Sequence, residues 1–432
     1  MFSFRTTSLE EQLDRALLEG RVGCFCTQNC WDTQRGRYMY DIFRERGNLQ
    51  VIFSPRDTEL TPDTNHIEFA PEDLVGLNAV VVEIQDVGTR YFNYTKDVFN
   101  LMDVLKQMKD DAPSLYIVDH INPAGRVVEG TMPSTVQEVN VPKVAHRHGL
   151  TLGELANLYY HEIGAKYALH VISALATDSN HQLMPWTIAP ASDIPGLFTC
   201  DMYSGGGLWN NTNISPGIGT ARPYEYIGAP YVKNVITEDL PSVPGALMRP
   251  CSFTPSCGKY AGRKCSGYQI MLVPGAEYHS LIHTLQLIRY FKENYSEFAL
   301  DEGFEAKLSD PVLMDYINGA ISTDEMREHV KLEEQKWIRK AKKFALYDDL
   351  PYRMKFSVSR AVRQEADTPR WFPWRTLTFT SRVTSTPSQP QTTCFALLST
   401  TTSIRATSLA STSAEFSLQE LPTPTTVRSA IS

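Results

Sequence analysis

The chain has 432 residues, of which 42% are hydrophobic and 21% charged, as in soluble globular proteins long enough for two domains. Its formal net charge of −8 disfavours nucleic acid as a partner, because a surface with that balance repels phosphate backbones. No apolar run approaches the roughly 18 residues of a membrane span, and the first residues lack the basic start and apolar stretch of a secretory signal. We therefore expect a cytoplasmic protein without a membrane span.

The N-terminal half of the chain alternates helical and strand patterns. A Ser-x-x-Glu box opens the first helix, and the most apolar strand lies at 79–84. The expected elements are, in chain order, helix 8–19, strand 22–26, helix 35–45, strand 49–53, strand 79–84, helix 95–108 and strand 115–118. Such alternation predicts a parallel sheet with right-handed crossovers. We assign residues 1–185 to a Rossmann-like, doubly wound α/β domain.

The following part of the chain predicts a second, smaller lobe. After a helix at 152–161 and a strand at 170–174, residues 184–255 are rich in Pro, Gly, Asn and Tyr and lose their periodicity. This is typical of a functional loop region. The elements expected after it are strand 267–273, helix 279–293 and helix 323–345. We expect residues 186–355 to form an α+β lobe that completes a cleft.

The C-terminal tail differs in composition from everything before it. Between Thr376 and Ser432, 26 of the 57 residues are Ser or Thr and none is Lys. A segment with so little apolar patterning cannot offset the entropy of ordering, so we predict a disordered tail over 356–432. A genuine linker and a misjoined reading frame both remain open as its origin.

The eight cysteines are expected to be free thiols. Cys24, Cys26 and Cys30 have the spacing C-x-C-x3-C, but no second pair stands nearby to complete a zinc site. His146 and His148 alternate like strand neighbours without a third ligand. A reducing compartment favours buried free thiols. We expect no metal and no organic cofactor.

Polar side chains cluster directly after three of the expected strands. They are Gln85, Asp86, Arg90, Tyr91 and Tyr94 after 79–84, Asp119, His120 and Asn122 after 115–118, and Arg56, Asp57 and Glu59 after 49–53. In an open parallel sheet, ligands bind beyond the carboxyl ends of the strands, so we expect these side chains to share one crevice. Carboxylates, amides and aromatic rings together are typical of sugar recognition.

Several of these residues lie in motifs that resemble those of the bacterial exo-β-N-acetylmuramidases, a family formerly catalogued as a domain of unknown function. Val82–Tyr94 resembles Asp-Ile-Gln-Asp-Val-Gly-x-Arg-x-Tyr-x-Tyr, and Val118–Gly125 resembles Leu-Asp-Arg-Pro-Asn-Pro-x-Gly. The further matches, in the family's order, are Val128–Gly130, Arg147–Ala156, Asn211–Ser215, Gly219–Thr220 and Pro223–Pro230.

This resemblance covers roughly residues 8–350. It implies a Rossmann-like domain and a small lobe with the active cleft between them. The implied activity is that of a glycosidase of cell-wall recycling, which releases N-acetylmuramic acid from the non-reducing end of peptidoglycan fragments.

The glutamate regarded as the family's catalytic acid is replaced in this chain. The family motif is Phe-Ser-Pro-Glu-His-Gly, whereas this sequence reads Phe53-Ser-Pro-Arg-Asp-Thr58, with Arg56 at the position of the glutamate. Glycoside hydrolysis needs a protonatable carboxyl, and a guanidinium stays charged at every working pH. We expect the carboxyl to come from Asp57 or Glu59, or from Asp86 acting with His148. In a milder change, Glu83 stands where the family has Asp.

Two sets of site residues follow. The catalytic set is Asp86, His148, Asp57 and Glu59, and the set that binds a muramic-acid-containing saccharide is Arg90, Tyr94, Asp119, Asn122, Arg147, Asn213 and Thr220. Simpler interpretations stay open, in which Asp86 and Arg90 pair to fix a turn and His148 is an ordinary residue before a helix. A non-catalytic amino-sugar-binding protein and an inactive product also stay open, and the sequence indicates no oligomeric state.

Overall fold

The computed structural model describes residues 19–32, 36–55, 60, 65–66, 69–134, 143–173, 188–233 and 240–347. All of them belong to one compact unit, residues 1–366. The expected helix at 8–19, apart from its last residue, and the expected tail at 356–432 lie outside the described residues. None of the described helices combines the length and the apolar character that a transmembrane helix requires.

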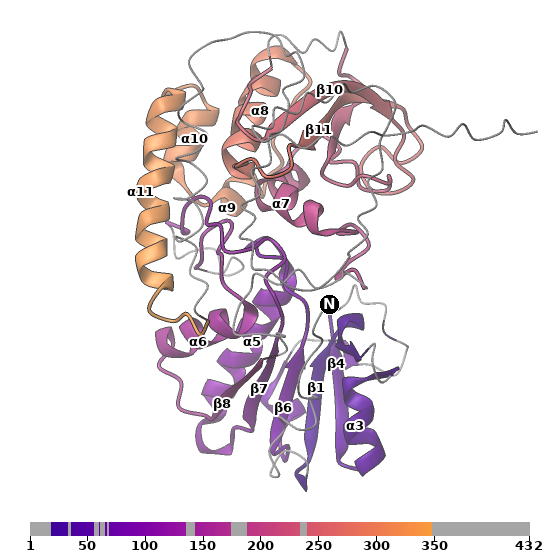
Figure 1. Cartoon of the computed structure of the whole chain (residues 1–432), viewed down its shortest axis with the longest axis vertical. Coiled ribbons are helices and arrows are strands. Elements are labelled where there is room, and N and C mark those ends of the chain that lie inside the picture. The colour runs from indigo at the N-terminus through magenta and orange to yellow at the C-terminus, as the bar shows by residue number, and fades with distance from the viewer. Residues whose placement is uncertain are drawn as a thin grey trace, which may run out of the picture. The chain divides into compact units, whose positions relative to one another are not determined.

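The first part of the chain forms a six-stranded sheet with the order β5-β4-β1-β6-β7-β8. Figure 1 labels β4, β1, β6, β7 and β8 side by side in this order. Its strands are β1 (Val22–Cys26), β4 (Leu49–Ser54), β5 (Asn65–His66), β6 (Ala79–Glu83), β7 (Ser114–Asp119) and β8 (Leu169–Ser173). Every neighbouring pair is parallel. The chain builds outwards from β1 to β5 and then returns to β6 on the other side of β1. The topological switch point, where such sheets bind ligands, therefore lies between β1 and β6.

Helices cover both faces of this sheet. The helices and short elements of this part are η1 (Gln28–Cys30), β2 (Trp31–Asp32), β3 (Arg37–Tyr38), α3 (Met39–Arg46), α4 (Pro71–Leu74), α5 (Asn93–Met108), η2 (Lys109–Asp111) and α6 (Leu152–Glu162). Side chains of a strand alternate between faces. Accordingly, Val80 and Val82 of β6 share one hydrophobic core with Leu101 of α5, whereas Val81 shares the other core with Phe43 of α3. The predicted doubly wound α/β class is confirmed, and the five predicted strands of this sheet agree with the observed ones within one residue at each end.

The second lobe combines a small antiparallel sheet with helices, as predicted. Its sheet has the order β10-β11-β9. The elements of this lobe are α7 (Leu197–Gly206), η3 (Gly207–Asn211), β9 (Tyr226–Ala229), β10 (Ala246–Phe253), β11 (Cys265–Leu272), α8 (Ser280–Asn294), α9 (Phe304–Leu308), α10 (Pro311–Ile317) and α11 (Thr323–Ala341).

The expectation of irregular chain over 184–255 is wrong for part of that region, which contains α7, β9 and β10. α7 buries most of its side chains, so its sequence lacks the polar stripe by which an amphipathic helix is recognised. β10 is paired with β11 along its whole length, but most of its residues are half-buried or exposed. Its sequence therefore lacks the apolar run of a buried strand.

Buried hydrogen bonds tie the second lobe to the first domain. The indole Nε1 of Trp337, in α11, donates to the carbonyl of His148 at 2.8 Å. The amide of Leu281, in α8, donates to Glu129 Oε2 at 3.1 Å. Both Trp337 and Glu129 are fully buried. α11 thus returns along the lobe to the first domain (Figure 1), while the domain boundaries drawn at 185 and 355 stay a prediction.

Candidate active site

Asp86 follows β6 and forms a buried pair with His148. Its Oδ2 lies 3.2 Å from His148 Nε2, and the carboxylate accepts hydrogen bonds from Thr95 Oγ1 and the Gly88 amide. Burial acts to raise the pKa of Asp86, but His148 and these hydrogen bonds outweigh it and hold the pKa below its ordinary value. A carboxyl that stays ionised is poorly suited to donate a proton. These contacts favour a positioning role, and the catalytic assignment of Asp86 and His148 stays a prediction.

The turn after β6 packs directly against the loop after β7. Gly88 has a φ of 84°, and a Cβ there would lie 2.4 Å from Asn122 Oδ1, so only glycine fits. Asn122 donates from Nδ2 to the Leu150 carbonyl at 2.9 Å, and its Oδ1 accepts from the Ala124 amide at 3.0 Å. The two family-like motifs are therefore brought together at one end of the sheet.

Arg90 connects this turn to the second lobe. Its guanidinium donates to the carbonyls of Thr131 at 2.8 Å and Leu308 at 2.6 Å. Asp86, Arg90 and Asn122 are each 3% exposed, and none of them lines either of the two cavities described below. That these three side chains hold one saccharide stays a prediction, because the contacts that we observe fix neighbouring loops instead.

Other predicted ligand-binding residues also bond to the protein itself. The hydroxyl of Tyr94 donates to the Pro190 carbonyl at 3.1 Å. Asn213 and Thr220 lie in the second lobe, where their side chains bond to loops of that lobe. Their described contacts do not reach the loops after β6 and β7.

Two of the predicted catalytic carboxyls are not placed. Asp57 and Glu59, together with Arg56, lie outside the described residues.

Asp119 ends β7 and is fully buried. Its carboxylate accepts hydrogen bonds from Thr151 Oγ1 at 2.7 Å, the Gly153 amide at 2.7 Å and the Tyr347 hydroxyl at 2.8 Å. Burial raises the pKa of Asp119 to about 6, although these hydrogen bonds oppose the rise. This residue therefore links the stability of the fold to pH, and its role in binding a saccharide stays a prediction.

The raised pKa of Asp119 gives a stability effect whose sign is fixed. The folded protein holds this proton more tightly than the unfolded chain, so the stability contributed by the protonated carboxyl is lost as the pH rises from 3.8 to about 6. Between about pH 4.5 and about pH 7 the expected loss is about 2 kcal/mol. Urea denaturation of the wild type and Asp119→Asn at both pH values checks this. Between these pH values, the free energy of unfolding of the wild type should fall by that amount relative to Asp119→Asn. An equal change in both proteins would contradict the assignment.

A small cavity lies at the carboxyl ends of β1, β6 and β7. Glu83, the last residue of β6, and His120, directly after β7, line it, with Glu83 Oε1 3.0 Å from His120 Nε2. Glu83 is 4% exposed, and its Oε2 is buried without a hydrogen-bond partner among the described residues. The cavity volume is about 40 Å³, enough for a water molecule. Because buried polar atoms normally have partners, the unpartnered Oε2 beside this cavity makes Glu83 a candidate site residue.

His120 was expected in the crevice, but neither Glu83 nor His120 was assigned a catalytic or binding role from the sequence, although a signal was present. Glu83 replaces the Asp of one family motif, and His120 replaces the Arg of another. The two replacements contact each other in the structure. Two simultaneous departures from the family motifs were therefore the sequence signal for this pair. Cys30 also lines this cavity, but burial raises the pKa of its thiol well above the ordinary value, so it stays protonated. Among the described residues, no three His, Cys, Asp or Glu side chains gather as a metal site.

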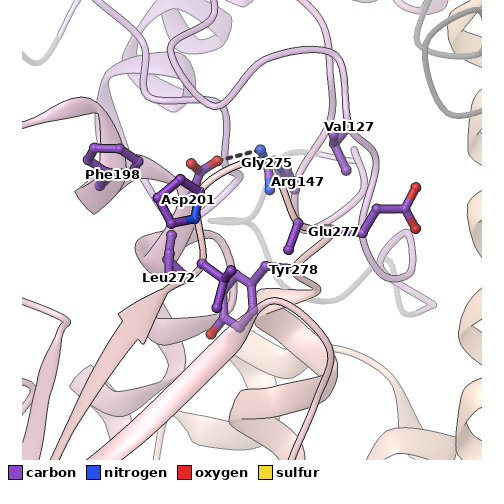
Figure 2. A pocket seen from close by; sticks show the side chains of 11 residues that line it. Val127, Arg147, Phe198, Asp201, Leu272, Gly275, Glu277 and Tyr278 are labelled. Carbon is purple, nitrogen blue, oxygen red and sulfur yellow. Dashed lines mark hydrogen bonds and ion pairs between the residues drawn. The ribbon is translucent and has the colours of Figure 1, made fainter. Parts of the chain in front are cut away.

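A larger pocket of about 330 Å³ lies between Arg147 of the first domain and residues of the second lobe (Figure 2). Arg147 lies 2.7 Å from Glu129 and 2.5 Å from Asp201, so its charge is already paired. The predicted role of Arg147 in holding a saccharide stays untested.

Comparison with known proteins identifies the family. Residues 64–192 match the N-terminal domain and residues 202–347 the C-terminal domain of the family described as exo-beta-N-acetylmuramidase NamZ. The peptidoglycan beta-N-acetylmuramidase NamZ of Bacillus subtilis (strain 168) is 27% identical over 290 residues, which are 64% of this chain and 69% of the relative.

Solved structures agree on the fold. Two crystal structures of DUF1343 family proteins from Bacteroides fragilis NCTC 9343 superpose with TM-scores of 0.66 and 0.64, at 19% and 20% identity. Each superposition covers 78% of this chain and 97% of the other. The two matched domains together span more than half of the 432 residues, which confirms the resemblance. This chain belongs to the exo-β-N-acetylmuramidase NamZ family.

Proposed function

We propose that the chain is a glycosidase that releases N-acetylmuramic acid from muramic-acid-containing saccharides of the cell wall, with Glu83 as its proton-transferring carboxyl. Membership of the family and the name of the Bacillus subtilis relative support this substrate class. The observation that carries the proposal is the buried Glu83–His120 pair with its unpartnered Oε2. This pair lies at the edge of the sheet where α/β proteins of this type bind ligands.

Glu83 supplies the protonatable carboxyl that Arg56 cannot supply. A glycosidase needs one carboxyl to protonate the leaving oxygen and a second to act as base or nucleophile on the other side of the sugar ring. Glu83 takes the first role, while His120, whose Nε2 lies 3.0 Å from Oε1, holds the carboxyl in place. The second carboxyl comes from the loop after β4, where Asp57 and Glu59 are the predicted candidates.

A chromogenic substrate tests the proposed function directly. The full chain is incubated with p-nitrophenyl N-acetyl-β-muramide and, for comparison, with the corresponding N-acetylglucosaminide. We expect release of p-nitrophenol from the muramide and little or none from the glucosaminide, because the latter lacks the lactyl carboxylate that distinguishes muramic acid.

The other outcomes each exclude the proposal. No turnover together with a higher melting temperature in the presence of N-acetylmuramic acid would identify a non-catalytic sugar-binding protein, since a ligand selective for the folded state raises stability. Neither turnover nor a thermal shift would indicate an inactive product. Equal turnover of both substrates would contradict the proposed specificity.

A further inference from the structure

The pocket beside Arg147 shares no lining residue with the cavity at Glu83 and His120. It lies next to α7 and the turn that follows β11, and Figure 2 shows the side chains that line it. Its volume of about 330 Å³ falls at the lower end of the range of small-molecule sites.

Arg147 does not offer a free positive charge to this pocket. Its guanidinium donates to Glu129 at 2.7 Å, to Asp201 at 2.5 Å and, from Nε, to the Ala124 carbonyl at 3.1 Å. The side chain is only 6% exposed. An arginine with these partners holds two carboxylates in place and is poorly placed to recognise an anion.

The charge that remains in the pocket is negative. Arg147 balances one of its two carboxylate partners, and Glu129 also lies 3.3 Å from His279 Nδ1. Glu277 in the lining adds a further negative charge. The side chain of Asp201 is 31% exposed, and Arg147 contacts its Oδ1. Among the described residues, no donor reaches the other oxygen, Oδ2. Burial and the nearby Glu129 raise the pKa of Asp201, although Arg147 acts to lower it. A cation at Oδ2 would lower this pKa, because it stabilises the ionised carboxylate.

An exposed aromatic ring accompanies this carboxylate. Phe198 and Asp201 are about one turn apart on α7, so they lie on the same side of the helix. Phe198 is 65% exposed. Leu272 and Val273 add apolar surface to the lining. A carboxylate, an aromatic face and an apolar wall together fit an ammonium group on an apolar stem, because the first two attract the charge and the third covers the stem.

We propose that this pocket binds a primary ammonium group carried on an apolar stem, such as a lysine side chain or the amino terminus of a short peptide. The ammonium group donates to Asp201 Oδ2 and lies against the ring of Phe198, while the stem contacts Leu272 and Val273. The proposal is independent of the glycosidase activity, because binding is measured without turnover and either proposal can fail alone.

n-Hexylammonium is a suitable probe, with n-hexanol and hexanoate as its neutral and anionic counterparts. Calorimetric or NMR titrations of the full chain should show hexylammonium binding about ten-fold more tightly than hexanol, with no binding of hexanoate. The affinity should fall as salt is added, because the attraction is electrostatic. Nα-acetyl-lysine methylamide and a dialanine methylamide with a free amino terminus then distinguish the two sources of the ammonium group.

Two variants test the residues that carry the proposal. Asp201→Asn keeps an acceptor for Arg147 but removes the negative charge, so the affinity for hexylammonium should fall about ten-fold. Phe198→Ala removes the aromatic face and should weaken binding about two- to five-fold. Glu293→Gln is the matched control, because this exposed carboxylate pairs with Arg289 on α8 outside the pocket lining. Circular dichroism shows whether each variant is folded.

Several results would overturn the proposal. These are equal affinities for hexylammonium and hexanol, tighter binding of hexanoate, or unchanged affinity in both Asp201→Asn and Phe198→Ala. Displacement of hexylammonium by an equal concentration of N-acetylglucosamine would make this a site for neutral sugars instead. If Asp201→Asn does not fold, Phe198→Ala and the salt dependence decide the matter.

Discussion

Glu83→Gln should reduce kcat for a chromogenic N-acetylmuramide by about 10²–10⁴-fold, the usual contribution of a general acid or base. The amide preserves the size of the side chain and can still contact His120, which lies 3.0 Å from Oε1. It has no proton to deliver to a leaving oxygen at neutral pH. The measurement is the rate of p-nitrophenol release at saturating substrate, with near-ultraviolet circular dichroism to show that the fold persists.

A matched control shows whether the loss of activity is specific to Glu83 or follows from removing any carboxylate. Glu225→Gln removes a carboxylate that pairs with Arg222 at 3.2 Å in the second lobe, and it should leave kcat unchanged. His120→Gln should lower kcat, because it removes the imidazole that lies 3.0 Å from Glu83 Oε1 and positions the carboxyl. Full turnover by Glu83→Gln would remove the assignment. Loss of turnover in Asp86→Asn, with Glu83→Gln active, would restore Asp86 as the catalytic carboxyl.

Much of the parallel sheet could be predicted because its sequence signals are local. β6 reads Ala-Val-Val-Val-Glu and is buried on both faces, which is the pattern of a central parallel strand. The apolar stripe of α5 likewise identifies a helix that packs on the sheet. β5 has only two residues, and most residues of α7 are buried, so neither carries such a signal.

The candidate site was less predictable because side-chain direction depends on distant contacts. Polar residues after the strands were identified, but Asp86 and Asn122 turn into the protein, where Thr95 and Leu150 are among their partners. Glu83 counted as part of a strand, yet it is the residue that lines the cavity. Segments that are far apart in sequence make the contacts that build this end of the sheet. No single motif predicts these contacts.

Glu154→Ala should lower the free energy of unfolding by about 3–5 kcal/mol, because it leaves a buried charge without its partner. Glu154 is fully buried and binds the guanidinium of Arg126, which is 8% exposed, through both carboxylate oxygens. The same carboxylate accepts hydrogen bonds from the amides of Thr151 at 2.9 Å and Leu346 at 3.0 Å. Removing it therefore also leaves two amides without acceptors. Urea denaturation at neutral pH measures the loss.

A second glutamate of the same helix provides the control. Glu162 pairs with Lys340 near the surface, with side-chain exposures of 28% and 29%, so Glu162→Ala should cost less than about 1 kcal/mol. The double variant Arg126→Met with Glu154→Met then separates the two causes of the loss. If the unpaired charge dominates, removing both charges should recover much of the stability. A double variant as unstable as Glu154→Ala would instead assign the loss to the unsatisfied amides of Thr151 and Leu346.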